Sequence, residues 1–263
     1  MARKALPGLN IDVEKIKKLL IAFIKEQLKR TGFTKLVMGI SGGVDSAVVA
    51  YLAAEAIERD NITGVIMPYA SSDKQNIKDA ELVLNILTIN RRVVDISPMV
   101  DAYFKNHPTD DLNRRGNKMS RERMSVLYDI SAEIGALVIG TSNKSEIKVG
   151  YGTLFGDLAC AINPLGDLYK TQVRQLARHL NIPEQIIAKP PSADLWQGQT
   201  DEGELGLTYK ELDTFLYYMD DQGHNDHQLE KLGFSAEFVK TMKIKIAKNE
   251  FKGRPPKIAL LPR

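Results

Sequence analysis

The stretch KLVMGISGGVDSAVVAYLAAEA, residues 35–56, constrains the fold of this chain more than any other. KLVMGI, at 35–40, predicts a buried strand, and SAVVAYLAAEAIERD, at 46–60, predicts a helix. The bend GISGGVDS therefore leads from the end of a strand into the start of a helix. A strand followed directly by a helix is the repeating unit of α/β folds.

The same alternation continues along the first half of the chain. Further strands are predicted at 61–68, 91–96 and 136–141, with helices at 12–30, 72–87, near 97–105 and at 121–135. Strands that alternate with helices imply βαβ units, so the predicted fold is a Rossmann-like α/β fold, a parallel sheet with helices on both faces. NHPTDDLNRRGNKMS, at 106–120, is polar and rich in turn formers, and we expect a mobile loop there.

After residue 150 the strand patterns fade and helices dominate. Helices are predicted at 169–181, 208–219 and 235–249, with a loop at 150–167 and a long polar loop at 188–206. Loops of that length within a compact domain are usually functional or disordered. We expect one domain over 1–263, with a nucleotide-binding α/β core at about 30–150 and a C-terminal loop and helical part at about 151–263.

Composition narrows the class of protein. The chain has 263 residues, of which 43% are hydrophobic, so it can bury a substantial core. A net charge of +3 suits an enzyme that acts on anionic metabolites and does not require nucleic acid. The single cysteine, Cys160, allows no disulfide within the chain, which suits the cytoplasm. We expect no membrane span and no signal peptide, because no apolar run is long enough.

The bend has the properties of a phosphate site. Parallel sheets bind ligands at the carboxyl ends of their strands, and Ser41, Gly42 and Gly43 stand at such an end. Glycines let backbone N–H groups approach a ligand, and the following helix N-terminus adds unpaired N–H groups. The alternative is a tight strand-to-helix turn with a capping serine, because generic SGG turns are common.

The acid in the bend distinguishes this phosphate site from the two common glycine-rich phosphate loops. A Walker A loop needs GxxxxGK[ST] and a dinucleotide fingerprint needs GxGxxG, and neither is present. Asp45 stands in the loop instead. A carboxylate beside phosphates repels them unless a cation lies between, so the sequence points to a bound Mg²⁺.

The stretch resembles the SGG-x-DS loop of the ATP pyrophosphatase group, which splits ATP between the α- and β-phosphates. Three further stretches narrow the resemblance to ammonia-dependent NAD synthetases: RRGNKMSRERM, ALVIGTSNKSEIKVGYGTLFGDLACAINPLGDLYKTQVRQLA and KPPSADLWQGQTDEGELGLTY. FKGRPP near the end adds to it. The resemblance covers nearly the whole chain and implies an adenine nucleotide alpha-hydrolase-like fold.

The resemblance implies a role for each matching residue. The implied ATP-binding residues are Gly39, Ile40, Ser41, Gly42, Gly43, Val44, Asp45, Ser46, Thr141, Lys170 and Ser192. The implied binders of deamido-NAD are Arg121, Asn117, Arg123, Asp157 and Lys252. Asp45 and Glu146 are the implied magnesium ligands, and together with Lys170 they form the implied catalytic set.

Simpler interpretations stand beside these roles. Glu146 can be an exposed acid at a helix start, Lys170 a surface lysine, and Arg121 with Arg123 a solvated helix face. Trp196 is either a stacking platform for a ring or a packing residue of a lid. The chain also departs from the family at Leu154, Ala161 and Phe251, where many members have lysine, aspartate and histidine. Those departures concern recognition of the nicotinate.

The implied reaction is ATP-driven amidation of deamido-NAD to NAD, with AMP and pyrophosphate released. Free ammonia is the expected nitrogen source, since no glutaminase domain is expected in the chain. Family members resemble one another in forming homodimers. Two rival functions remain: an adenylating amidase or thiolase that acts on another substrate, and a module that senses ATP without turnover.

Overall fold

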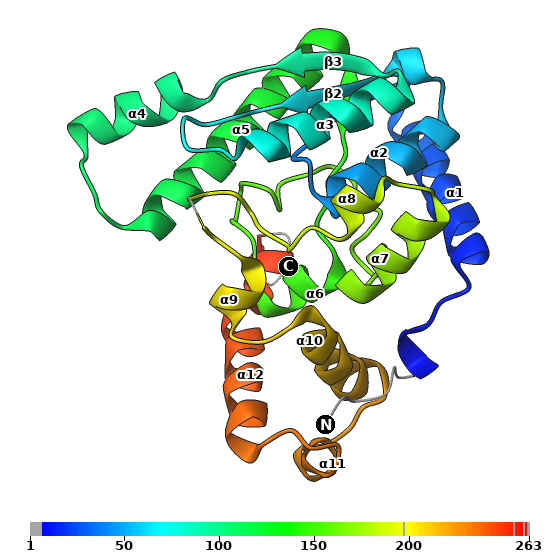
Figure 1. The fold of residues 1–263 in the computed structure, drawn as a ribbon, viewed down its shortest axis with the longest axis vertical. Coiled ribbons are helices and arrows are strands. Elements are labelled where there is room, and N and C mark those ends of the chain that lie inside the picture. The colour runs from blue at the N-terminus through cyan, green and yellow to red at the C-terminus, as the bar shows by residue number, and fades with distance from the viewer. Residues whose placement is uncertain (1–6, 197, 255, 260, 262–263) are drawn as a thin grey trace.

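A computed structural model describes residues 7–196, 198–254, 256–259 and 261. Its described part contains a four-stranded parallel sheet with the order β3-β2-β1-β4 (Figure 1). The strands are β1 (Lys35–Gly39), β2 (Ile62–Ile66), β3 (Asn90–Val93) and β4 (Ala136–Val138).

Helices make up most of the remaining structure. They are α1 (Val13–Thr31), α2 (Val44–Ala56), α3 (Lys74–Leu87), α4 (Ser97–Asn106), α5 (Leu112–Ile134), α6 (Lys144–Val149), α7 (Lys170–His179), α8 (Glu184–Ile187), α9 (Asp201–Leu205), α10 (Tyr209–Leu216), α11 (Asp226–Lys231) and α12 (Ala236–Asn249). Short helical turns occur at η1 (Pro7–Leu9), η2 (Arg59–Asn61), η3 (Tyr217–Asp221) and η4 (Glu250–Gly253). Among the described residues, no helix has both the length and the apolar character needed to cross a membrane.

Strands β1, β2 and β4 bury both of their faces, whereas the edge strand β3 is largely exposed. In β1, Leu36 and Met38 belong to a hydrophobic cluster that also contains residues of α1, α2, α3, α7 and α8. Val37, which points to the opposite face because side chains alternate along a strand, belongs to a cluster with residues of α4 and α5. The predicted parallel sheet with helices on both faces is therefore confirmed.

The strand order creates a switch point beside β1. The chain passes outward from β1 to β2 and β3 and then returns to place β4 on the other side of β1. Ligands of open α/β sheets bind outside the carboxyl ends of the strands at such a point. A parallel bridge between Ile139 and Ile162 continues the edge beyond β4 and brings the segment after α6 to the same place.

The prediction of a loop at 106–120 was largely wrong. Helix α5 begins at Leu112, after Asp111 caps it by accepting a hydrogen bond from the Arg114 backbone N–H at 3.1 Å. The buried side of this turn uses small residues: a Cβ at Gly116 would lie 2.8 Å from Leu195 Cδ1. Because Met119 is the one large apolar residue among the buried positions of 112–120, hydrophobic periodicity failed to detect the start of the helix.

The C-terminal half is richer in helices than predicted. The segment at 188–206 was expected to be a loop, yet its last residues form α9, which Thr200 caps by accepting from the Gly203 backbone N–H. Helices α6, α8 and α11 were not predicted, because each has only four to six residues. Helices α10, α11 and α12 lie below the sheet (Figure 1) and build their own core around Phe215.

Candidate active site

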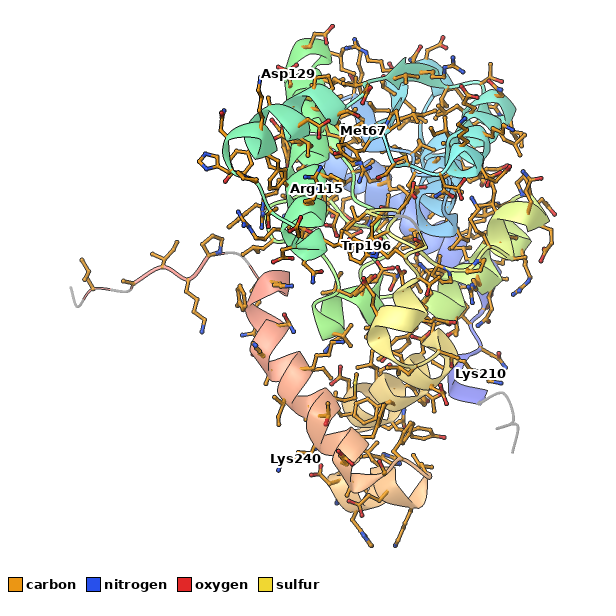
Figure 2. All side chains as sticks on the ribbon, turned by 60° about the vertical axis from the view of Figure 1, so that its left-hand side comes forward. Met67, Arg115, Asp129, Trp196, Lys210 and Lys240 are labelled. Atoms are coloured by element: carbon orange, nitrogen blue, oxygen red, sulfur yellow. The ribbon has the colours of Figure 1, made fainter. Side chains whose placement is uncertain are left out.

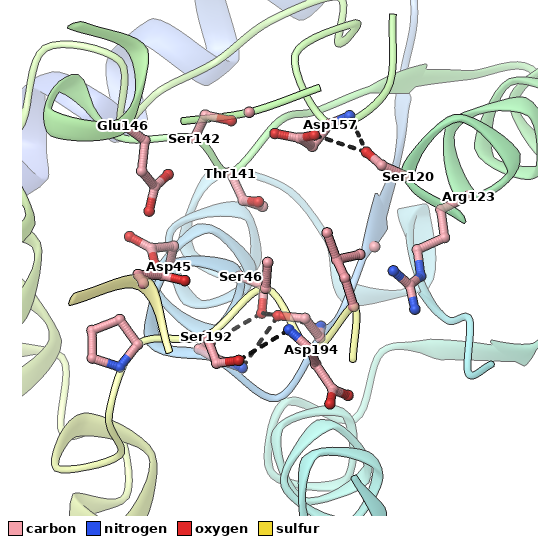
Figure 3. Close-up of a pocket in the computed structure, with 18 of the residues that line it drawn as sticks. Asp45, Ser46, Ser120, Arg123, Thr141, Ser142, Glu146, Asp157, Ser192 and Asp194 are labelled. Carbon is pink, nitrogen blue, oxygen red and sulfur yellow. Dashed lines mark hydrogen bonds between the residues drawn. The ribbon is translucent and has the colours of Figure 1, made fainter. Parts of the chain in front are cut away.

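A cavity of about 500 Å³ lies at the carboxyl ends of β1 and β4. Every predicted ATP-binding residue except Gly42 lines this cavity, and so do Glu146 and four of the five predicted deamido-NAD binders (Figure 3). These side chains come from segments far apart in the sequence. The switch point of the sheet therefore collects almost the whole predicted site.

The bend after β1 forms a compact turn over the start of α2. The backbone N–H of Gly43 donates to Ser41 Oγ at 3.2 Å, and Ser46 Oγ donates to the Gly43 carbonyl at 3.0 Å. Gly42 has φ of +80°, and a Cβ there would lie 2.2 Å from the Asn76 carbonyl oxygen, so only glycine fits. Gly43 caps α2 without a side-chain bond, which leaves N–H groups of its first turn available to an anion.

Lys170 lies between the two predicted metal ligands. Its ammonium donates to Asp45, and to Glu146 Oε1 at 3.2 Å, while its side chain is only 4% exposed. Figure 3 shows the carboxylates of Asp45 and Glu146 facing each other. A buried ammonium is tolerated only when paired, so the two acids explain why Lys170 can be buried. The interpretation of Lys170 as a surface lysine is wrong.

Glu146 is not an exposed helix-start acid either, because its side chain is 15% exposed. It forms a capping box with Asn143: the Glu146 backbone N–H donates to Asn143 Oδ1 at 3.1 Å, and the Asn143 N–H donates to Glu146 Oε2 at 3.2 Å. This box fixes one carboxylate oxygen and directs the other to Lys170. Burial raises the pKa of Glu146 to about 7; Lys170 opposes this effect, whereas Asp45 and Asp201 add to it.

A second buried acid holds the backbone of Lys170. Asp213, from α10, accepts hydrogen bonds from Ser145 Oγ and from the Thr171 N–H, the latter at 2.8 Å. The same Ser145 hydroxyl accepts from the Lys170 N–H at 2.9 Å. Burial raises the pKa of Asp213, and these donors counteract that shift. The C-terminal helices thus position the N-terminus of α7, and with it the Lys170 side chain.

Of the predicted deamido-NAD residues, Asn117, Arg123 and Asp157 line the cavity on the side of α5. Thr153 Oγ1 donates to Asn117 Oδ1 at 2.7 Å, and Ser120 Oγ donates to Asp157 Oδ1 at 2.8 Å. Arg123 Nε donates to the Met67 carbonyl at 3.0 Å. Partial burial lowers the pKa of Arg123, and the nearby Asp194 and Asp157 oppose that effect.

Two of the predicted deamido-NAD binders, Lys252 and Arg121, donate hydrogen bonds to backbone carbonyls. Lys252 lines the cavity, but its ammonium donates to the carbonyls of Gly150 and Gly152 at 2.8 and 3.2 Å. Arg121 is exposed on α5, is not among the lining residues, and donates from Nε to the Leu154 carbonyl at 3.1 Å. The family departures Leu154, Ala161 and Phe251 do not line the cavity in this structure.

Several cavity residues were missed by sequence reasoning. Asp201 is buried; its carboxylate accepts from Tyr209 at 3.1 Å and from Tyr151 at 3.0 Å. Lys189 lines the cavity three residues before Ser192. A lysine next to two prolines in a polar segment was the only available indication, and it does not specify a contact.

Residues 189–196 and Gln199 close one side of the cavity. Trp196 lines the cavity together with its neighbour Leu195, and it also lies beside Arg115 in a smaller adjoining pocket (Figure 2). Asp194 accepts from the Asp73 N–H at 3.2 Å, which ties the segment to the start of α3. Trp196 is thus part of the cavity wall. This position is compatible with both roles considered for it, a stacking platform for a ring and a packing residue of a lid.

A model of the NAD synthase family matches residues 16–256. The chain belongs to the NAD synthase family. An ammonia-dependent NAD synthetase of Fusobacterium nucleatum is 46% identical to it over 97% of this chain and 99% of the relative. These findings support ammonia-dependent NAD synthetase function, that is, a ligase that forms a C–N bond.

Solved structures agree with this membership. The ammonia-dependent NAD synthetase of Campylobacter jejuni is similar with a TM-score of 0.81 and 36% identity, covering 95% of this chain and all of that one. An NMN synthetase of Francisella tularensis is similar with a TM-score of 0.83 and 33% identity, covering 96% and 99%. The chain therefore has the fold of NAD synthetases of the adenine nucleotide alpha-hydrolase type.

We predict that Lys170→Met lowers the free energy of unfolding near neutral pH by about 3–5 kcal/mol, because it leaves two buried carboxylates without their cation. Chemical denaturation followed by circular dichroism measures the loss. Lys148→Met is the matched control, since Lys148 makes a half-exposed ion pair with Asp220 and is expected to contribute less than about 1 kcal/mol. Equal effects of the two substitutions would contradict the buried role of Lys170.

Proposed function

We propose that this cavity amidates deamido-NAD to NAD in two steps, using ATP and ammonia. In the first, the nicotinate carboxylate attacks the α-phosphorus of ATP, giving an acyl-adenylate and pyrophosphate. In the second, ammonia attacks the acyl carbon and AMP leaves. The observation that carries the proposal is the buried cluster of Asp45, Lys170 and Glu146 beside the uncapped N-terminus of α2.

The phosphate end of ATP is assigned to the bend. Free N–H groups at the start of α2 and the hydroxyls of Ser41 and Ser46 offer donors to phosphate oxygens. Lys170 provides a positive charge close to them, and Thr141 and Ser192 contribute hydroxyls from the opposite walls. Because these groups are preorganised, they stabilise the charge that develops on the leaving pyrophosphate.

The donor atoms in the cluster fit Mg²⁺. Asp45 and Glu146 offer only oxygen ligands and carry more negative charge than Lys170 neutralises. A third acid, Asp201, lies near enough to raise the pKa of Glu146. Among the described residues, no three acidic, histidine or cysteine side chains gather as a metal site, so phosphate oxygens would complete the coordination. When bound there, Mg²⁺ supplies Lewis-acid stabilisation of phosphate charge.

The substrate end is assigned to the α5 side of the cavity. Asn117, Arg123, Asp157 and Lys252 line it and offer both amide and charged groups for the dinucleotide. Arg121 is proposed to contact the substrate from the exposed surface of α5. We also propose that residues 189–196 and Gln199 exclude water from the acyl-adenylate, since they already form one wall of the cavity.

One assay tests the reaction. The purified chain is supplied with ATP, Mg²⁺, ammonium and deamido-NAD, and AMP, pyrophosphate and NAD are measured in equal amounts if the proposal holds. Glutamine in place of ammonium is expected to give little NAD. A parallel reaction with nicotinate mononucleotide is included because a similar structure is named an NMN synthetase. AMP formation that does not depend on deamido-NAD would contradict the proposal.

Asp45→Asn is expected to abolish turnover while the fold remains, because the amide keeps the shape of the side chain and loses the charge that a cation needs. Turnover and circular dichroism are measured on the same sample. The control is Asp129→Asn, an exposed acid at the end of α5 far from Arg115 (Figure 2), which is expected to retain full activity. Near-normal activity of Asp45→Asn would remove the metal role.

We infer that the chain forms a homodimer through α4 and α5. Helix α4 projects from the body of the molecule (Figure 1), and Met99, Tyr103, Leu112 and Tyr128 on these two helices are large apolar residues that are 41–50% exposed. The family resemblance favours the same state. Light scattering is expected to give twice the chain mass of 29.3 kDa, and Tyr103→Glu is expected to shift it toward one chain mass. A single chain mass for the parent would contradict the inference.

A further inference from the structure

The phosphate loop is held by a side chain that no motif in the loop predicts. Lys189, which follows α8, reaches the loop and donates from Nζ to the Gly42 carbonyl at 3.1 Å. It also donates to Asn76 Oδ1 at 2.8 Å and forms an ion pair with Asp79. A lysine ammonium has three N–H donors, so these three acceptors use all of them.

Asp79 makes it unfavourable for the Lys189 ammonium to leave these partners. It lies on α3, is 1% exposed, and also accepts from Gln75 Nε2 at 3.0 Å and from Gln185 Nε2 at 2.8 Å. A buried carboxylate that loses its cation is strongly unfavourable. Lys189, which lines the cavity, is therefore held on the Gly42 carbonyl and on acceptors of α3, whereas a Walker lysine donates to the phosphates.

The contact with Gly42 fixes the direction of one peptide unit. In a trans peptide the carbonyl of residue 42 and the N–H of residue 43 point in opposite directions. Lys189 draws the Gly42 carbonyl toward α3, and the Gly43 N–H accordingly points to Ser41 Oγ at 3.2 Å. Gly43 and Ser41 line the cavity, whereas Gly42 does not.

We propose that Lys189 is a positioning residue for ATP: by holding the Gly42 carbonyl, it turns the Gly43 N–H toward the phosphate site. Pro190 and Pro191 restrict the backbone between this anchor and Ser192, which lines the same cavity. Lys189 thus sets the loop and the start of the cavity wall together. The inference rests on the proposed phosphate-binding role of the loop.

Two variants separate the loop contact from the ion pair. Asp79→Asn keeps Lys189 on Gly42 and Asn76, so the KM for ATP is expected to stay within about threefold of the parent. Lys189→Met with Asp79→Asn removes both charges and the loop contact, and is expected to raise the KM for ATP by about tenfold or more. The KM for deamido-NAD is expected to stay near the parent value in both variants. Lys78→Met, an exposed lysine of α3, is the control.

Binding is measured independently of turnover. Trp196 is the only tryptophan of the chain and lines the cavity, so its fluorescence reports ATP addition. The proposal is overturned if the double variant has the same KM for ATP as Asp79→Asn, if both KM values rise together, or if Asp79→Asn tightens ATP binding, which would make Lys189 a direct phosphate ligand. A parent chain that neither binds ATP nor forms NAD would instead contradict the proposed function.

Discussion

The arrangement of the cavity depends on the burial of one ammonium group among acids. Lys170 is almost fully enclosed, and its charge is compensated by Asp45 and Glu146 from the ends of two neighbouring strands. A buried charge must keep its partners, so this contact fixes the positions of α2, α6 and α7 relative to one another. The C-terminal helices contribute through Asp213, which fixes the backbone where α7 begins. The proposed catalytic roles and the structural roles therefore fall on the same residues.

This cluster also explains why a switch-point sheet suits the chemistry. Neighbouring parallel strands end at the same edge, so acids that follow β1 and β4 meet although they are far apart in sequence. Asp45 lies in the first turn of α2 and Glu146 in the first turn of α6. Both carboxylates thus sit at helix N-termini, where a negative charge is favoured. Phosphates placed beside them compete for the same positive ends, and a cation resolves that competition.

The sequence predicted the parts of this site that depend on local pattern. The strand, the glycine bend and the acid of GISGGVDS lie within twelve residues, so their geometry follows from the strand-to-helix turn. Glu146 and Lys170 were predicted only through the family resemblance, because their contact depends on how α6 and α7 pack. The helix at 112–120 was missed since Met119 is its one large apolar buried residue, beside the small residues Gly116 and Ser120.

Lys189 illustrates why the remainder is hard to predict. Its partners, Gly42, Asn76 and Asp79, lie more than 100 positions earlier in the chain, on two different elements. Nothing in the sequence around these residues indicates an ion pair, and Asp79 lies in an ordinary helical pattern. The lysine that a Walker loop carries in its own sequence is here divided into two functions. In the proposed site, Lys170 brings positive charge to the phosphates, and Lys189 fixes the loop through the Gly42 carbonyl.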